Sequence, residues 1–177
     1  MISQIQMPDA QIAKIVITSR TLYGARKTIS AIKRTVPDGR IRGAGLKGIF
    51  ILEVEGDVQE LAQRINQECS QSIGRAVAVL AEVPSTLDSI RESAIRIGKE
   101  RIAEDESFCF RLHKRGEHGL DQDTPKIEHD VGGAIWKALE QRYGKSPRVD
   151  LKDPDVTILA EVFGANTAVG ILKKAWR

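Results

Sequence analysis

All three histidines of the chain lie in one segment, FCFRLHKRGEHGLDQDTPKIEHDVGG (108–133), together with one of its two cysteines. Histidine and cysteine are typical zinc ligands, and a zinc site needs about four ligands at workable spacing. Cys109 and His113 share a face of a predicted strand, whereas His118 falls in a predicted loop and His129 on the outer side of a predicted helix. No fourth ligand follows at a familiar spacing, so the sequence predicts no metal site.

Cys109 and His113 are also the residue types of a nucleophile and its base. That chemistry needs a third group to orient the base, and a cysteine inside a strand is more often unreactive packing. A small enzyme that uses Cys109 and His113 therefore stays an alternative. The sequence predicts instead that the protein is not an enzyme and has no cofactor.

Binding of a polyanion fits this segment better. Basic side chains leave the strand end and enter a glycine-bearing loop, and the N-terminus of the next helix favours a phosphate through its N–H groups and its dipole. Gly132 and Gly133 leave one turn of that helix without side chains, so a ligand can approach its backbone. In the alternative, the acids of the loop pair with the bases, and the glycines only allow close helix packing. The candidate site consists of Arg111, Lys114, Arg115, His118, Lys126 and Gly132.

A second basic stretch runs from Arg20 to Lys47 and holds eight Lys or Arg residues and one acid, Asp38. On a chain of net charge +3 this local excess indicates a polyanionic partner, although a solvated basic helix face is the alternative. The glycines of GAGLKG (43–48) match a dinucleotide-binding pattern, but a strand follows where that pattern needs a helix, so we predict a connection between strands. The residues expected to extend the binding surface are Arg26, Lys27, Arg42 and Lys47.

The elements that must position these residues fall into two groups. Residues 12–83 predict the order strand, helix, strand, strand, helix, strand, which is a ferredoxin-like βαββαβ unit. Residues 84–177 predict a helix, a strand over 106–115, a helix that begins at Thr124 and Pro125, a short strand and a closing hairpin. The sequence therefore predicts an α+β fold with a ferredoxin-like domain over 1–83 and an α/β domain over 84–177.

The composition, 29% charged and 41% apolar, is that of an ordinary globular protein. No apolar run approaches the length of a membrane-spanning helix, and residues 1–11 lack the features of a signal peptide, so we expect a cytoplasmic location. The stretch KGIFILEV (47–54) resembles a strand of RNA-recognition domains and of transcription elongation factors, but Ile49 and Ile51 stand where bases would stack on aromatic rings. A transcription elongation-type or other protein-interaction module is a further alternative.

Several segments of the second half together resemble a THUMP domain over residues 85–174, namely FRLHKRGEH, EHDVGGAI, VDLKDPDVTILAEV and the last hairpin strand. The resemblance implies that an α/β THUMP domain follows the ferredoxin-like domain and that the two grip the acceptor stem and 3′ CCA end of tRNA. Arg111, Lys114 and Arg115 would then bind phosphates, His118 a phosphate or a base, and Lys126 a terminal phosphate.

The resemblance also implies a role for the whole chain. Lys174 lies three residues from the C-terminus, which leaves no room for the catalytic domain that many relatives carry. Such a chain is similar to the adaptor that helps an RNA cytidine acetyltransferase make N4-acetylcytidine. We therefore expect a non-catalytic tRNA-binding protein, with tRNA and a tRNA-modifying enzyme, first of all an acetyltransferase, as its partners.

Overall fold

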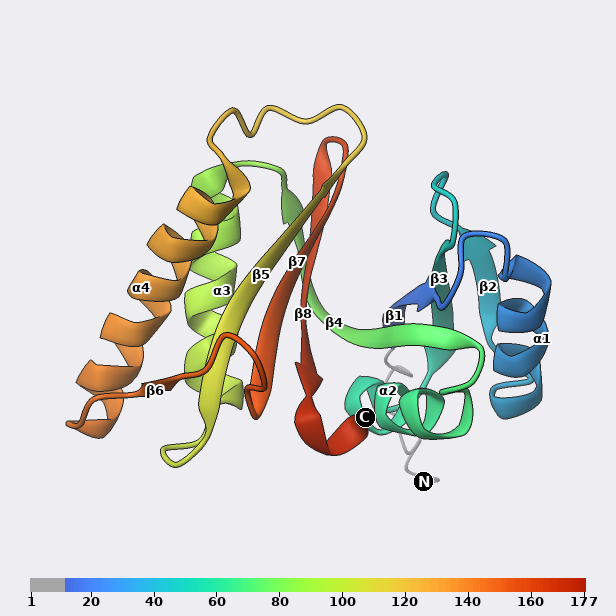
Figure 1. The fold of residues 1–177 in the computed structure, drawn as a ribbon, viewed down its shortest axis with the longest axis horizontal. Helices are drawn as coiled ribbons and strands as arrows, with labels where there is room; N and C mark the ends of the chain where they lie inside the picture. Colours follow the sequence, from blue (N-terminus) through green and yellow to red (C-terminus); the bar gives the residue numbers. More distant parts are fainter. Residues whose placement is uncertain (1–11) are drawn as a thin grey trace, which may run out of the picture. The chain divides into compact units, whose positions relative to one another are not determined.

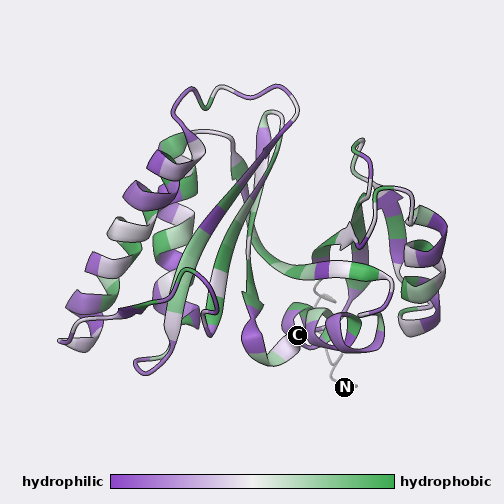
Figure 2. Ribbon diagram, viewed as in Figure 1, coloured by the Kyte–Doolittle hydropathy of each residue, from purple (hydrophilic) through white to green (hydrophobic). Residues whose placement is uncertain are grey.

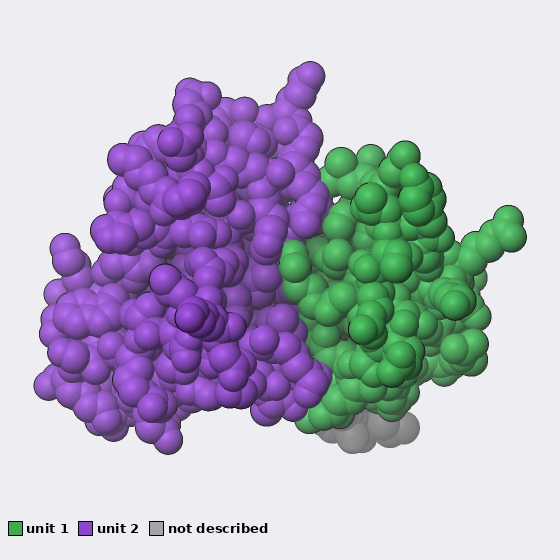
Figure 3. Space-filling model, viewed as in Figure 1, with its two compact units in different colours: residues 1–76 green, residues 77–177 purple. Residues whose placement is uncertain are grey.

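The computed structural model describes residues 12–177 of the chain, so the start of the predicted first domain lies outside the described residues. The chain divides into two compact units, residues 1–76 (unit 1) and residues 77–177 (unit 2) (Figure 3). The elements are β1 (Ile12–Ser19), α1 (Ala25–Thr35), β2 (Arg40–Gly43), β3 (Ile49–Glu55), α2 (Val58–Glu68), β4 (Ile73–Pro84), α3 (Leu87–Arg101), β5 (Ser107–Arg115), α4 (Thr124–Tyr143), β6 (Arg148–Val149), β7 (Val156–Phe163), β8 (Asn166–Lys173) and a 3₁₀ turn (Lys174–Trp176). A domain boundary between residues 83 and 84 stays a proposal.

Unit 1 has the predicted βαββαβ order, with strands arranged β2-β3-β1-β4, and the boundary between the two units falls within β4, after Ala76. β1 pairs antiparallel with β3, and Ile15 faces Leu52 in the register. Both side chains are fully buried, as are Ile32 of α1 and Ile65 of α2, so one apolar core joins the sheet to its two helices. The connection between β2 and β3 holds Gly45 and Gly48 at φ of 76° and 73°, which confirms that GAGLKG joins two strands.

In unit 2 the strands are arranged β4-β8-β7-β5-β6. β5 is parallel to β7 and to β6, whereas β7 and β8 form the predicted antiparallel hairpin. Helices α3 and α4 lie side by side next to the sheet (Figure 1), and the central strands are largely apolar along their length (Figure 2). Ile97 of α3 and Ile135 of α4 are fully buried, so the fold is the predicted α+β arrangement.

Local chemistry explains where the helices begin and end. Asp57 caps α2, because its carboxylate accepts the N–H groups of Gln59 and Glu60 at 2.9 and 2.8 Å. Gly144 ends α4 in the left-handed conformation, with φ of 69°. The apolar spacing of residues 21–36 predicts a helix that begins at residue 21, and this start is wrong. TLYG forms a turn in which the N–H of Gly24 donates to the carbonyl of Thr21, and α1 begins at Ala25.

Gly170 of β8 lies where no side chain fits. A Cβ atom there would stand 2.1 Å from the carbonyl oxygen of Ala78 in β4, and backbone cannot yield as a flexible side chain does. We expect Gly170→Ala to lower the free energy of unfolding by about 1–3 kcal/mol, the usual range for overpacking, as measured by urea denaturation. Gly119→Ala is the control, since a Cβ at Gly119 meets no atom within 4 Å. Equal denaturation midpoints for the two variants would contradict the expectation.

Candidate nucleic-acid interface

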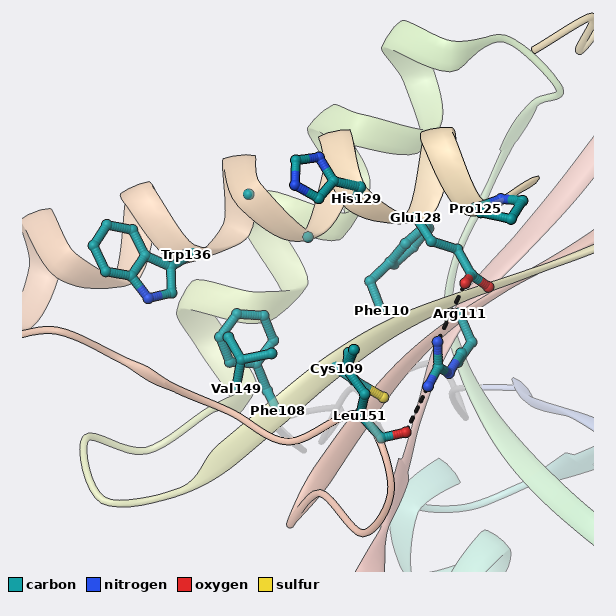
Figure 4. A pocket seen from close by; sticks show the side chains of 12 residues that line it. Phe108, Cys109, Phe110, Arg111, Pro125, Glu128, His129, Trp136, Val149 and Leu151 are labelled. Carbon is teal, nitrogen blue, oxygen red and sulfur yellow. Dashed lines mark hydrogen bonds and ion pairs between the residues drawn. The ribbon is translucent and has the colours of Figure 1, made fainter. Parts of the chain in front are cut away.

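A hollow of ≈ 480 Å³ lies in unit 2 between β5, α4 and the segment that follows β6 (Figure 4). Four successive residues of β5, from Phe108 to Arg111, line it. Successive side chains of a strand point to opposite faces, so a wall made of four in a row means that the hollow follows the edge of the strand. β6 pairs with β5 only at Ser107 and Phe108, which leaves the edge beyond that point open to the hollow.

The opposite wall is the N-terminal half of α4, which includes Gly132 and Gly133. A Cβ atom added at either glycine would meet no atom within 4 Å. Close helix packing therefore does not account for the two glycines, and that alternative from the sequence has no support. Each glycine in a helix interior costs about 1 kcal/mol relative to alanine. What their missing side chains provide here is open space beside the helix backbone.

The rest of the lining is mostly apolar and aromatic. Phe108 and Phe110 come from β5, and Trp136 comes from α4. The indole N–H of Trp136 donates to the carbonyl of Pro147 at 3.1 Å. Val149 and Leu151 stand at the other side with 52% and 63% of their surface exposed. An apolar hollow with aromatic walls and few polar groups suits a flat, partly polar ring.

The VDLKDPD motif holds Val149 and Leu151 in place. The Asp150 carboxylate accepts the N–H groups of Asp153 at 3.0 Å and Lys152 at 2.9 Å, and these hydrogen bonds lower its pKa. The Asp155 carboxylate accepts the N–H and the hydroxyl of Ser107, both at 2.8 Å, which likewise lowers its pKa. The motif thus ties the segment after β6 to the start of β5.

Arg111 closes one end of the hollow (Figure 4). Its guanidinium lies 3.2 Å from the Glu128 carboxylate and donates to the carbonyl of Leu151 at 2.6 Å. The second oxygen of Glu128 accepts the N–H of Leu112 at 2.9 Å and so satisfies one backbone donor of the open strand edge. The Arg111 side chain keeps 34% of its surface exposed, so it is oriented by Glu128 and still accessible.

Three other predicted residues shape the loop 116–123 and the start of α4. The Lys114 ammonium donates to the carbonyls of Leu120 and Gln122, and Nδ1 of His118 accepts the N–H of Leu120 at 3.3 Å. Lys126 is 63% exposed and lies 3.6 Å from Asp130. Within residues 12–177 the loop acids Glu117, Asp121 and Asp123 form no ion pair, so they do not neutralise the basic residues as the alternative supposed.

Arg115 and His113 lie around Glu161 of β7 and do not line the hollow. Glu161 is fully buried, forms an ion pair with Arg115, and lies 3.3 Å from Nδ1 of His113. Of the predicted unit 2 residues, the structure therefore brings Arg111 and Gly132 to the hollow and gives Lys114, Arg115, His118 and Lys126 partners elsewhere. Their contacts with RNA remain a prediction.

The predicted residues of unit 1 have different surroundings. Arg42 of β2 lies 3.7 Å from the Glu53 carboxylate of β3. Lys47 is exposed in the connection between β2 and β3, and Arg26 and Lys27 are exposed in the first turn of α1. Their contacts with RNA also remain a prediction.

The nucleophile alternative finds no support in the geometry of Cys109. Its side chain is buried, its sulfur contacts the hydroxyl of Thr157 at 3.8 Å, and burial raises the pKa of the thiol, which keeps it protonated and unreactive. Across residues 12–177, no three His, Cys, Asp or Glu side chains lie close enough together to hold a metal ion.

Sequence reasoning missed Trp136, Glu128 and Glu161 as residues that build or support this region. A signal existed for Glu161, since it is the one charged residue in the apolar strand VTILAEVF and needs a buried partner. A weaker signal existed for Trp136, which follows Gly132 by one helical turn and so shares its face. Nothing in the sequence indicated that Glu128 reaches the edge of β5.

Residues 84–172 match the family model described as THUMP domain. A probable tRNA sulfurtransferase of Methanosarcina mazei is 38% identical over 76 residues, which are 43% of this chain and 18% of that protein. Among solved structures, PH1313 of Pyrococcus horikoshii has a TM-score of 0.61 at 19% identity, over 91% of this chain and 54% of the other. A 4-thiouridine synthetase in complex with RNA and ATP has a TM-score of 0.59 at 12% identity, over 92% of this chain and 42% of the other. At these identities the structural likeness shows the fold.

The expectation that the protein is not an enzyme is wrong. Several curated relatives are named tRNA sulfurtransferase, which is an enzyme, and they contradict it. This chain spans between 14% and 25% of the length of those relatives, so the position of Lys174 near its end has no bearing on catalysis. None of the helices in residues 12–177 combines the length and the apolar character that a bilayer crossing needs.

The family match and the architecture agree on the second half of the chain. The match over residues 84–172 covers half of the 177 residues and contains β5, the hollow beside α4 and the β7–β8 hairpin. The chain therefore belongs to the THUMP domain family.

Proposed function

We propose that the chain binds tRNA in the course of tRNA modification and that the hollow of unit 2 receives a base of the unpaired 3′ CCA end. The observation that carries this proposal is the wall formed by Gly132 and Gly133. Two glycines that weaken a helix and relieve no steric contact are explained if a ligand needs the space beside them.

The lining of the hollow supports an unpaired base as that ligand. Proteins bind single-stranded RNA by stacking its bases on aromatic side chains and by hydrogen bonds to the base edges. Trp136 is partly exposed and offers aromatic surface, whereas Phe108 and Phe110 line the hollow but are buried, at 1% and 3% exposure. The open edge of β5 offers backbone hydrogen-bonding groups. Arg111, held by Glu128, stands at one end, where it can contact a phosphate or a base edge.

Thiolation is the modification that the comparisons favour, because the relatives named above are tRNA sulfurtransferases. Acetylation of cytidine, with an acetyltransferase as the partner, is the second candidate and has only the sequence resemblance behind it. Nucleoside analysis of tRNA from cells without this protein separates the two. Loss of 4-thiouridine supports thiolation, and loss of N4-acetylcytidine with 4-thiouridine unchanged supports acetylation.

Binding to the 3′ end can be tested by titration of the protein with intact tRNA and with the same tRNA that lacks its CCA, at two salt concentrations. We expect trimming to weaken binding about tenfold at both salts, because stacking contributes about 1–3 kcal/mol per base. Equal affinities with a steep salt dependence would reduce the interaction to general phosphate attraction and would contradict the proposed site.

A further inference from the structure

A second groove, of ≈ 540 Å³, runs along the exposed face of α1 in unit 1. Three of its lining side chains are positively charged, three are uncharged and polar, and none is acidic. They are Arg26, Lys27, Ser30 and Arg34 of α1, and Gln71 and Ser72 of the turn between α2 and β4. Such a lining matches a chain of phosphates, each of which accepts hydrogen bonds and carries negative charge.

Buried hydrogen bonds hold the two walls of the groove together. Thr28 of α1 is fully buried, and its hydroxyl donates to the carbonyl of Ser72 at 3.0 Å and lies 2.6 Å from the hydroxyl of Ser19. Arg20 donates from its guanidinium to the carbonyl of Ser70 at 3.1 Å. The turn 70–72 is thus fixed to α1 and to the end of β1, so the groove is preformed.

The positive charge of the groove is not balanced within the described part of the chain. No acid occurs between Ser19 and Pro37, and neither Arg26 nor Lys27 forms an ion pair with any of residues 12–177. Both lie in the first turn of α1, where positive side chains oppose the helix dipole. A bound phosphate would offset this unfavourable arrangement.

An exposed aromatic ring lies at the same end of α1. Tyr23 and Leu22, in the turn just before the helix, are 90% and 65% exposed. Basic residues that follow a sugar–phosphate backbone, combined with an aromatic ring on which a base stacks, are typical of surfaces that bind single-stranded nucleic acid. An acidic protein surface would satisfy the charges, whereas RNA supplies both phosphates for the basic side chains and flat bases for the ring of Tyr23.

We propose that this groove of unit 1 binds the phosphate backbone of RNA and that Tyr23 stacks on an unpaired base beside it. The inference rests on the proposed RNA-binding function and adds a second site with its own residues. Arg34 and Arg26 contact phosphates, and Tyr23 contacts a base.

Salt titrations test the phosphate contacts. Affinity for intact tRNA is measured over a series of salt concentrations for the wild-type protein, Arg34→Ala and Lys33→Ala. Lys33 is the matched control, because it is the exposed neighbour of Arg34 on α1, carries the same charge and does not line the groove. We expect the slope of log affinity against log salt to become less steep by about 0.7–0.9 for Arg34→Ala, the loss of one phosphate contact, and to stay unchanged for Lys33→Ala.

Substitution of Tyr23 tests the stacking contact at fixed salt. Tyr23→Ala is expected to weaken binding about fivefold, the lower end for a base stacked on an aromatic ring, and Tyr23→Phe to bind as the wild type does. Circular dichroism on each variant confirms that it is folded.

The outcomes separate this inference from the proposed function. Suppose that wild-type protein binds tRNA in a CCA-dependent way but Arg34→Ala and Lys33→Ala show the same salt slope. The proposal that the groove binds phosphates is then overturned, and the proposed function stands. If Tyr23→Ala binds as tightly as the wild type, the stacking contact is overturned. Wild-type protein that binds no tRNA would overturn both proposals.

Discussion

Arg115→Ala is expected to lower the free energy of unfolding by about 3–5 kcal/mol, the usual cost of removing one partner of a buried ion pair. The reason is Glu161, which is 0% exposed in the middle of β7 and forms its ion pair with Arg115. His113, 3.3 Å from the other carboxylate oxygen, remains in contact with Glu161 in the variant. The variant removes the guanidinium that pairs with this buried carboxylate.

Urea denaturation of three variants measures this. Arg115→Ala should lose the most stability, whereas Arg115→Met combined with Glu161→Leu should recover much of the loss, because an apolar pair removes the charge that needs a partner. Lys126→Ala is the control, since Lys126 is a predicted RNA contact that is 63% exposed and lies 3.6 Å from Asp130. If Arg115→Ala lowers the free energy of unfolding by less than about 1 kcal/mol, the pair of Arg115 with Glu161 contributes no more than a surface ion pair does, which contradicts the expectation.

The result bears on how the predicted site residues are tested. Arg115 was expected to bind phosphate, and any loss of RNA binding in Arg115→Ala has to be compared with its loss of folding. Lys114 raises the same difficulty, because its ammonium holds the loop through the carbonyls of Leu120 and Gln122. Arg111 and Gly132 are sharper probes, because both line the hollow directly.

The fold was predictable because its signals are local. A nearly continuous run of apolar residues identifies β7, and Asp57 and Gly144 carry the chemistry of a helix start and a helix end. The start of α1 was misplaced because the apolar spacing continues back to Leu22, whereas the turn that ends at Gly24 excludes a helix there.

The site was predictable only in part, because it depends on contacts between distant segments. Basic residues near the end of β5 indicated an anion, but the sequence does not show that Glu128 orients Arg111 across 17 residues or that Leu151 accepts its second hydrogen bond. The glycine pair was recognised, yet whether it relieves packing or opens a hollow depends on what lies opposite. The structure answers this with a Cβ position that meets no atom.

Gly132→Leu should change stability and RNA binding in opposite directions. Leucine favours the interior of a helix over glycine by nearly 1 kcal/mol, and the space at Gly132 is open, so the variant should be as stable as the wild type or more so. The same side chain should enter the hollow between Phe110 and Trp136 and exclude a base. We expect its affinity for intact tRNA to fall about tenfold to a hundredfold.

A cycle of four titrations shows whether the loss comes from the 3′ end. Wild-type protein and Gly132→Leu are each titrated with intact tRNA and with tRNA that lacks its CCA, and we expect the substitution to have no effect on the trimmed RNA. Gln141→Leu is the matched control, because it adds the same side chain to an exposed position of α4 outside the hollow. An equal loss on both RNAs would mean that the hollow does not receive the CCA end. Full binding by a stable Gly132→Leu would mean that the glycines of α4 have a role other than making room for RNA.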